Sequence, residues 1–348
     1  MKRGFLKNFI LQNENAMYYE CGYSCDNAIY ITLGSESFFI TDGRYEIDAR
    51  ENIKNGAELI ITRELLRDAR KIIKKSKIKK IYFDPSDFSI SDYFEISRKL
   101  DVKFEKAISF SKQKRIIKSD HEIELLSKAM KFGREGFSIF REYLDQDGLG
   151  KSEQYLAFMA RTALSDMGKY DLSFDPIVAI NENSAKPHAI PTDKLYSNDD
   201  ILLFDGGIKY QRYCSDRTVT FGQNFNPQDS FQRIQIFKNT NYQKVYDVVL
   251  KAQQTTISKA KIGMKASEID KIGRDIIEEA GYGQYFVHST GHGVGLDIHE
   301  YPNISSKSDV ILEENMVFTI EPGIYLPNEF GVRIEDTIVL KNDGAVIL

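Results

Sequence analysis

The chain has 348 residues, of which 42% are hydrophobic, 28% charged and 12% aromatic, and its formal net charge is −4 at pH 7. This length suits one large domain or two ordinary ones, and the near-neutral charge provides no electrostatic basis for binding nucleic acid. The apolar runs are too short for a transmembrane helix, and polar residues interrupt the basic start, so we expect neither a membrane partner nor a signal peptide. Three cysteines, an odd number, fit a reducing compartment and favour a cytoplasmic location.

The first hundred or so residues alternate between strand-like and helix-like segments. Residues 28–33 (AIYITL) and 37–41 (SFFIT) are predicted to form a hairpin. The basic run at 70–80 contains regularly placed isoleucines, so it is interpreted as a solvated helix leading into a strand and not as a binding patch. A helix at 42–54 and strands at 57–62 and 80–84 complete a compact mixed α/β domain.

A domain boundary is predicted near Gln113, because a long helix begins shortly after it. Ser119 and Glu122 form the S-x-x-E pattern of a capping box, which marks the start of a helix. Residues then recur at alternating steps of three and four, which is one helical stripe ended by Gly148: Ile123, Leu126, Met130, Gly133, Phe137, Phe140 and Leu144. We therefore expect one domain at 1–113 and a second at 114–348.

The remainder of the second domain is predicted to be α+β, with helices packed on an antiparallel sheet. Helices are expected at about 151–167, 231–261 and 266–280. Strongly strand-like segments lie at 176–180, 201–207, 316–326 and 331–340.

Two hairpin-like segments of this domain each carry a pair of acids. Asp205 and Asp216 belong to the first segment, and Glu321 and Glu335 belong to the second. Each acid interrupts an apolar strand, so it points toward a core, where an unpaired carboxylate is very costly. A single acid of this kind is often a turn cap or an ion-pair partner. Four on neighbouring strands would repel one another unless cations lay between them, so the pattern indicates a metal site.

Three of the five histidines, His288, His292 and His299, lie within the stretch FVHSTGHGVGLDIHEYP. A helix that presents metal ligands would carry histidines four residues apart and no glycines. Glycine at alternate positions, including Gly291 and Gly293, predicts irregular or extended backbone that closely approaches another part of the molecule. We interpret that part as the metal centre.

The order of these motifs resembles that of metallopeptidase family M24, the pita-bread fold of Xaa-Pro aminopeptidases and prolidases. The matching elements are D-(x10)-D, HSTGHGVGLDIHE, EPG and GVRIED, and they extend over most of the second domain. The N-terminal stretch, including its DGRY, resembles a creatinase-type N-terminal domain. The resemblance implies an α/β N-terminal domain followed by an α+β pita-bread catalytic domain.

The resemblance also implies two divalent metal ions held by five ligands. These are Asp205, Asp216, His292, Glu321 and Glu335. In the family pattern Asp216 and Glu335 bridge the two ions, Asp205 chelates one, and His292 with Glu321 holds the other. Four carboxylates balance the charge of two divalent ions. A set rich in oxygen with one imidazole suits Mn²⁺, and Co²⁺ or Zn²⁺ could also occupy it.

Catalytic roles follow from the same resemblance. Glu321 is expected to act as general base in two-metal hydrolysis. His188, in SAKPHAIP, and His299 are expected to stabilise charge on the tetrahedral intermediate or to move a proton. His288 is expected at the border of the substrate pocket, with structural packing as the alternative.

The family pattern further implies that Arg333 and Tyr325 lie at the substrate side and orient Asp205 through hydrogen bonds. One departure stands out: where the family has S-D-x-T-R-T, this chain has SDRTVTF, with Arg217 and Val219. We expect the charge to have moved to the other face of the strand without disturbing the ligands. Cys214 is interpreted as a small buried residue and not as a ligand.

The resemblance implies an aminopeptidase that cuts the Xaa-Pro bond of peptides with proline in second position. A prolidase, which takes dipeptides only, is the alternative, and a catalytically inactive protein-binding module is an alternative of a different class. Methionine aminopeptidases usually lack the preceding domain, and creatinases do without the ligands. The two-domain relatives are mostly homodimers in which the N-terminal domain leans over the partner's cleft, so a homodimer is expected.

Overall fold

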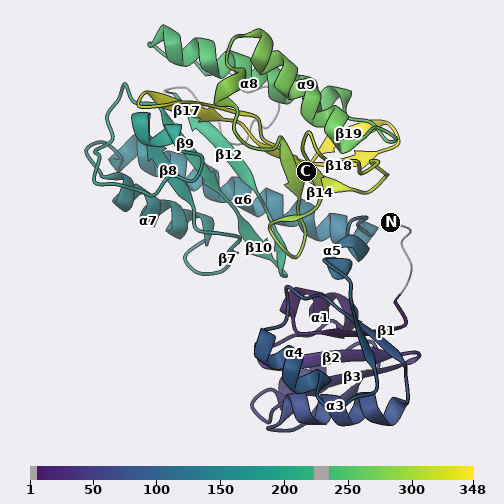
Figure 1. Ribbon diagram of the computed structural model, residues 1–348. Helices are drawn as coiled ribbons and strands as arrows, with labels where there is room; N and C mark the ends of the chain where they lie inside the picture. The colour runs from purple at the N-terminus through teal and green to yellow at the C-terminus, as the bar shows by residue number, and fades with distance from the viewer. Residues whose placement is uncertain (1–5, 223–234) are drawn as a thin grey trace. The chain divides into compact units, whose positions relative to one another are not determined.

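The computed structural model describes residues 6–222 and 235–348 (Figure 1). It divides into two compact units, one ending at residue 114 and the other beginning at residue 115. In the described part of the chain, no helix is both long enough and apolar enough to cross a membrane.

The first unit is built on a six-stranded mixed sheet with the order β4-β3-β2-β1-β5-β6. Its elements are β1 (Asn8–Leu11), α1 (Glu14–Cys21), β2 (Ala28–Leu33), β3 (Glu36–Thr41), α2 (Glu46–Asn52), β4 (Glu58–Ile61), α3 (Leu65–Ser76), β5 (Lys80–Phe83), α4 (Ile90–Ser97), β6 (Lys103–Lys106) and α5 (Phe110–Lys114). β2 and β3 form the predicted antiparallel hairpin, whereas β4, β5 and β6 each run parallel to a neighbour.

Both faces of this sheet are buried. On β2, Tyr30 packs into one hydrophobic cluster while Ile29 and Ile31 pack into another, as the alternation of strand side chains requires. The basic run forms the end of α3 and leads into β5, as predicted. Strand β1, whose four residues lie in the middle of the sheet, was not predicted from the sequence.

The second unit begins with a long helix, α6 (Asp120–Asp147), and the predicted capping box is confirmed. Ser119 Oγ accepts from the Glu122 backbone, and the Glu122 carboxylate accepts from Ser119 N at 2.8 Å. The C-terminal part of the apolar stripe, Phe137, Phe140 and Leu144, packs with α7 (Glu153–Leu164) on a three-stranded antiparallel sheet, β12-β9-β8. The ring of Phe204 on that sheet lies 4.2 Å from Phe137 and 4.7 Å from Phe140, between centroids.

The remaining strands form a five-stranded sheet, β14-β13-β15-β18-β19, a second three-stranded sheet, β11-β10-β7, and a hairpin, β16-β17. The strand bounds are β7 (Asp171–Leu172), β8 (Ile177–Ile180), β9 (Leu202–Gly206), β10 (Ile208–Tyr210), β11 (Tyr213–Cys214), β12 (Arg217–Phe221), β13 (Gly291–Gly293), β14 (Glu300–Ile304), β15 (Val317–Ile320), β16 (Gly323–Leu326), β17 (Phe330–Arg333), β18 (Asp336–Lys341) and β19 (Gly344–Ile347). Two short 3-10 turns lie at Asn181–Ala185 and Gly283–Tyr285.

Helices α8 (Thr240–Lys259) and α9 (Ala266–Glu279) lie side by side over these strands (Figure 1). Their buried faces contribute to the clusters that contain Phe318 and Ile338 on one side and Ile324 and Val332 on the other. The helix predicted at 231–261 starts later than expected, because the Asn239 side chain caps it by accepting from the backbone of residues 241 and 242. Residues 231–234 of that prediction lie outside the described residues.

Candidate metal centre

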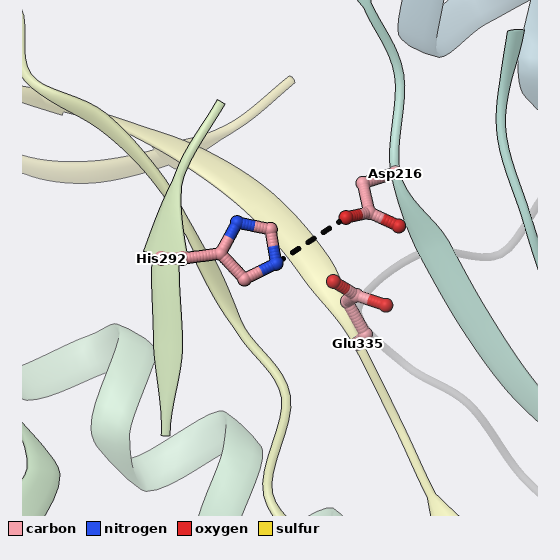
Figure 2. Close-up of side chains that lie close together, drawn as sticks. All are labelled: Asp216, His292 and Glu335. Atoms are coloured by element: carbon pink, nitrogen blue, oxygen red, sulfur yellow. Dashed lines mark ion pairs between the residues drawn. The ribbon is translucent and has the colours of Figure 1, made fainter. Parts of the chain in front are cut away.

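Asp216, His292 and Glu335 converge on one point in the second unit. Each offers one ligand atom, and these atoms lie within 4.8 Å of one another. Figure 2 shows the three side chains approaching from separate segments: Asp216 directly precedes β12, His292 lies in β13, and Glu335 directly precedes β18. His292 Nε2 is 3.5 Å from Asp216 Oδ2. The arrangement has the composition of a site for a divalent cation.

Glu321 and Asp205 adjoin this group. Glu321 directly follows β15, and its Oε1 lies 3.3 Å from His292 Nε2. Asp205 lies on β9, outside the set of three, and its Oδ2 accepts from Arg333 Nη2 at 2.7 Å. Burial is the main cause that raises the pKa of Glu321, and the charge of Asp205 acts in the same direction, so Asp205 lies close enough to influence the other acids.

The acids sit at different places in the strands than expected. Asp205 interrupts a strand, but Asp216, Glu321 and Glu335 occupy short breaks between strands. Backbone hydrogen bonds fix two of these breaks: Glu335 N donates to Thr218 O at 3.0 Å, and Glu321 N donates to Thr290 O at 2.8 Å. A break lets a side chain leave the alternation of the pleat, so the acids of neighbouring segments can turn toward one point.

The glycines beside His292 have a different role from the one predicted. A Cβ at Gly291 would lie 1.9 Å from Thr319 O, and one at Gly293 would lie 2.1 Å from Tyr301 O. The close approach is therefore to the backbone of neighbouring segments and not to the metal centre, which corrects the sequence interpretation. Only glycine leaves room for this packing, which holds His292 between β14 and β15.

Burial and mutual repulsion dominate the electrostatics of the acids. Burial raises the pKa of Asp216 and of Glu335 well above the ordinary range, and neighbouring carboxylates add to both effects. Burial also raises the pKa of Glu321, to about 7. Burial lowers the pKa of His292, which favours the neutral imidazole that a metal requires.

One buried oxygen tests whether these residues fit a metal. Among the described residues, Asp205 Oδ1 is buried and has no hydrogen-bond donor. Such an acceptor normally finds a partner, because its desolvation is otherwise uncompensated. A bare carboxylate oxygen beside three acids and a neutral imidazole is suited to receive a cation, so the residues present fit divalent metal ions.

Arg333 connects several groups around the acids. Besides its bond to Asp205, it donates from Nη1 to Tyr325 Oη at 2.8 Å and from Nε to Thr218 Oγ1 at 3.0 Å. Thr218 Oγ1 in turn donates to Glu335 Oε2 at 2.7 Å. The guanidinium therefore orients Asp205 directly and Glu335 through Thr218, whereas Tyr325 reaches Asp205 only through Arg333.

Thr319 is a further residue of the site, and it was not predicted from the sequence. Its hydroxyl donates to Glu321 Oε1 at 3.1 Å and accepts from the His292 backbone N–H at 3.1 Å. It therefore links two of the proposed ligands. The signal that could have found it is the period of two, since Thr319 precedes Glu321 by two residues at the end of β15.

The other three histidines of interest surround the acids. His288 is half-buried, its Nε2 lies 2.8 Å from Tyr325 Oη, and burial lowers its pKa to about 4, with the charge of Arg333 acting in the same direction. His299 is exposed, and its ring centroid lies 4.3 Å from that of His292. His188 is exposed on the loop after β8, and the preceding Pro187 O accepts from Arg333 Nη1 at 3.1 Å.

The departure at Arg217 and Val219 did not move charge across the strand. Both side chains are buried on the face of β12 that packs toward Phe137: Val219 belongs to the same hydrophobic cluster, and the Arg217 guanidinium carbon lies 5.8 Å from the ring centroid. Positions two apart on a strand share a face, so the charge has shifted along it. Arg217 Nε lies 3.7 Å from Asp336 Oδ1.

Cys214 is buried beside the centre but is not in the set of three. Its Sγ lies 3.6 Å from Leu296 O, and burial raises the pKa of the thiol to about 11. A thiol that stays protonated is a poor metal ligand.

Comparison with known proteins also indicates a metal-dependent enzyme. The family model of metallopeptidase family M24 matches residues 124–342, and the model of the creatinase/prolidase N-terminal domain matches residues 1–117. The chain belongs to metallopeptidase family M24. An Xaa-Pro dipeptidase of Pyrococcus horikoshii is 34% identical over 341 residues, which cover 97% of this chain and 90% of that protein.

Solved structures of M24 relatives share the whole architecture. That of an Xaa-Pro dipeptidase from Bacillus anthracis is 31% identical with a TM-score of 0.89, and covers 98% of this chain and 92% of its own. That of an X-Pro aminopeptidase from Thermotoga maritima is 32% identical with a TM-score of 0.84, and covers 98% and 95%. The predicted fold, an α/β N-terminal domain with an α+β pita-bread catalytic domain, is confirmed. The prediction that the chain is a hydrolase of the exopeptidase type is also confirmed. The comparisons are consistent with either an aminopeptidase or a dipeptidase.

Proposed function

We propose that this M24 enzyme hydrolyses the Xaa-Pro bond at the N-terminus of short peptides, with dipeptides as its main substrates. The observation that carries the proposal is the convergence of Asp216, His292 and Glu335, with Glu321 and Asp205 beside them. The preference for dipeptides rests on relatives that are named Xaa-Pro dipeptidases over nearly the full chain. The X-Pro aminopeptidase relative supports the second candidate, an aminopeptidase that accepts longer peptides.

Five residues would hold two divalent ions: Asp205, Asp216, His292, Glu321 and Glu335. Bound ions would supply a Lewis acid for the scissile carbonyl and would make a water molecule more acidic. Carboxylate oxygens outnumber the single imidazole, a composition that suits Mn²⁺, with Co²⁺ or Zn²⁺ as alternatives. The inactive binding module is disfavoured, because the full ligand set is present.

The chain's own residues have separate tasks in the proposed reaction. Glu321 accepts a proton from the attacking water, since its carboxylate lies at the centre and its pKa is raised by burial. His188 and His299, both exposed beside the acids, stabilise the negative charge that develops on the carbonyl oxygen, and the proton that Glu321 has accepted passes to the leaving nitrogen. His288 and Tyr325, joined by their 2.8 Å contact, border the substrate. Arg333 holds Asp205 in place.

We further propose that the enzyme is a cytoplasmic homodimer. The boundary between an N-terminal domain and the catalytic domain is placed at 113/114. All five proposed metal ligands then belong to the catalytic part, and the N-terminal part would serve substrate length selection by the partner subunit.

The deciding experiment compares hydrolysis of an Xaa-Pro dipeptide with that of an Xaa-Pro-Yaa-Zaa tetrapeptide in added Mn²⁺. We expect the dipeptide to be cut with the higher kcat/KM. Equal or better cleavage of the tetrapeptide would favour the aminopeptidase. The His292→Ala variant is the control, and cleavage of either peptide by that variant at the normal rate would contradict the proposed metal centre.

A further inference from the structure

The loop that carries His188 is held by one buried carboxylate from another element. Glu153 belongs to the first turn of α7, and its exposed fraction is 0%. The loop runs from the end of β8 to the start of β9 and carries His188 in its first half. Glu153 is far from His188 in the sequence and does not belong to the metal centre.

Four hydrogen bonds converge on this carboxylate. Oε1 accepts from Ile180 N at 2.6 Å, and Oε2 accepts from Asn183 Nδ2 at 2.8 Å. Oε2 also accepts from Thr192 N at 2.7 Å and from Thr192 Oγ1 at 2.6 Å. The donors lie on both sides of His188, so a single side chain ties the residues before His188 to Thr192 after it.

All four donors are neutral groups, so the carboxylate is held by hydrogen bonds and not by an ion pair. The donors belong to the last residue of β8 and to the loop that follows it. An ionised carboxylate is an acceptor only, and bonds to it are shorter and stronger than those between neutral groups. Asn183 Nδ2 also donates to Ile190 O at 3.0 Å, which ties the near side of the loop to its far side. Glutamine at position 153 would present an amide N–H where the protein supplies N–H donors, and the loop would have to move.

Two further contacts connect the same loop to the metal centre. Ser184 Oγ accepts from Gly331 N at 2.8 Å on β17, and Pro187 O accepts from the Arg333 guanidinium that binds Asp205. His188 directly follows Pro187. Glu153 thus holds the loop on both sides of His188, and Arg333, which also binds Asp205, holds the residue directly before His188.

We propose that Glu153 is a positioning residue for His188, holding the imidazole where it meets the developing charge of the reaction. This inference rests on the proposed function, in which His188 acts on the substrate. Glu153 itself touches neither substrate nor metal ligand. Its loss displaces His188 while the metal centre stays complete.

The first test is Glu153→Gln in the full-length enzyme, assayed with an Xaa-Pro dipeptide in Mn²⁺. We expect kcat to fall about 10- to 100-fold, because a displacement of about 1 Å at a reacting group has an effect of that size. KM and metal content should stay near those of the parent enzyme. Glu182→Gln is the matched control: Glu182 is an exposed acid on the same loop that pairs with Lys194, and its substitution should leave kcat unchanged.

Non-additivity separates positioning from general destabilisation. In a His188→Ala background, Glu153→Gln should reduce kcat by less than about twofold, because residues that act as one unit have effects that do not multiply. Multiplied effects in the double variant would overturn the inference. If His188→Ala alone leaves turnover unchanged, the proposed function of His188 fails instead, and the two failures are distinguishable.

Thr192 provides a second route if Glu153→Gln does not fold. Thr192→Val removes one of the four donors and keeps the backbone bond, and kcat should fall. Thr192→Ser keeps the hydroxyl and should restore it. A serine variant as slow as the valine variant, or a valine variant as fast as the parent, would overturn the inference.

Discussion

The crowded acids of the metal centre predict an unusual dependence of stability on pH. Burial raises the pKa of Glu321 to about 7 from its ordinary 4.5. Because this pKa is higher in the folded than in the unfolded chain, the fold favours the protonated acid. The stability that Glu321 contributes is complete below about pH 4.5 and is lost as the pH rises through about 7.

The size of the effect follows from the two values. A tenfold change in proton affinity corresponds to about 1.4 kcal/mol, so the metal-free protein should lose on the order of 3 kcal/mol at Glu321 between these pH values. Asp216 and Glu335 act in the same direction, since their pKa values are also raised by burial. A divalent ion that binds the ionised acids should restore this stability, and should do so more at neutral than at acidic pH.

The assay is urea unfolding of chelator-treated protein at about pH 5 and about pH 7.5, with and without Mn²⁺. Glu321→Gln should reduce the loss of stability between the two pH values, whereas Glu124→Gln, at an exposed acid on α6, should not. The reasoning is refuted if the metal-free parent loses no more stability between the two pH values than the metal-free Glu321→Gln variant does. Equal stabilisation by Mn²⁺ at both pH values would refute it as well.

Three further predictions concern the metal centre and the domains. His292→Ala should lose one of two bound ions, whereas His188→Ala and His299→Ala should keep both ions and lose most turnover. Elemental analysis of each variant, together with its kinetics, tests this prediction. Loss of metal from His188→Ala would contradict it. Thr218→Val removes the donor to one proposed ligand and the acceptor for Arg333. It should weaken Mn²⁺ binding about 10- to 100-fold, measured by calorimetry. Deleting residues 1–113 leaves every proposed ligand in place, so the truncated chain should still bind metal but lose discrimination by peptide length; an unchanged preference would count against the proposed role of that domain.

Much of the fold could be predicted because its signals are local. The capping box at Ser119 and the stripe of α6 need only neighbours three or four residues away, and both agree with the structure. The hairpin at β2 and β3 is equally local. The start of α8 was misjudged because helix periodicity extends past the actual cap, and the cap of Asn239 decides where the helix begins.

The geometry of the site was less accessible, since it depends on contacts between distant residues. The glycines beside His292 looked like a metal-binding feature, but they are required by carbonyl groups of β14 and β15. Thr319 and Glu153 are polar residues without any motif, and their roles appear only when Glu321 or the loop of His188 is folded against them. No pattern along the chain carries that information.

The buried acids show that neighbours, more than residue type, decide whether the protein itself balances the charge of a buried carboxylate. Glu300 is as buried as Asp216 and Glu335, yet Lys118 and Arg115 offset the effect of burial and lower its pKa. Their nitrogens lie 2.7 and 3.0 Å from its two oxygens, so its charge is balanced by the protein. Asp216 and Glu335 have other carboxylates as neighbours, and their pKa values are raised. In the sequence, Glu300 lies next to His299 and Glu335 lies next to Asp336, and nothing in either stretch distinguishes the two acids. Only the fold determines that Lys118 and Arg115 neutralise the first, whereas the second lies among other carboxylates.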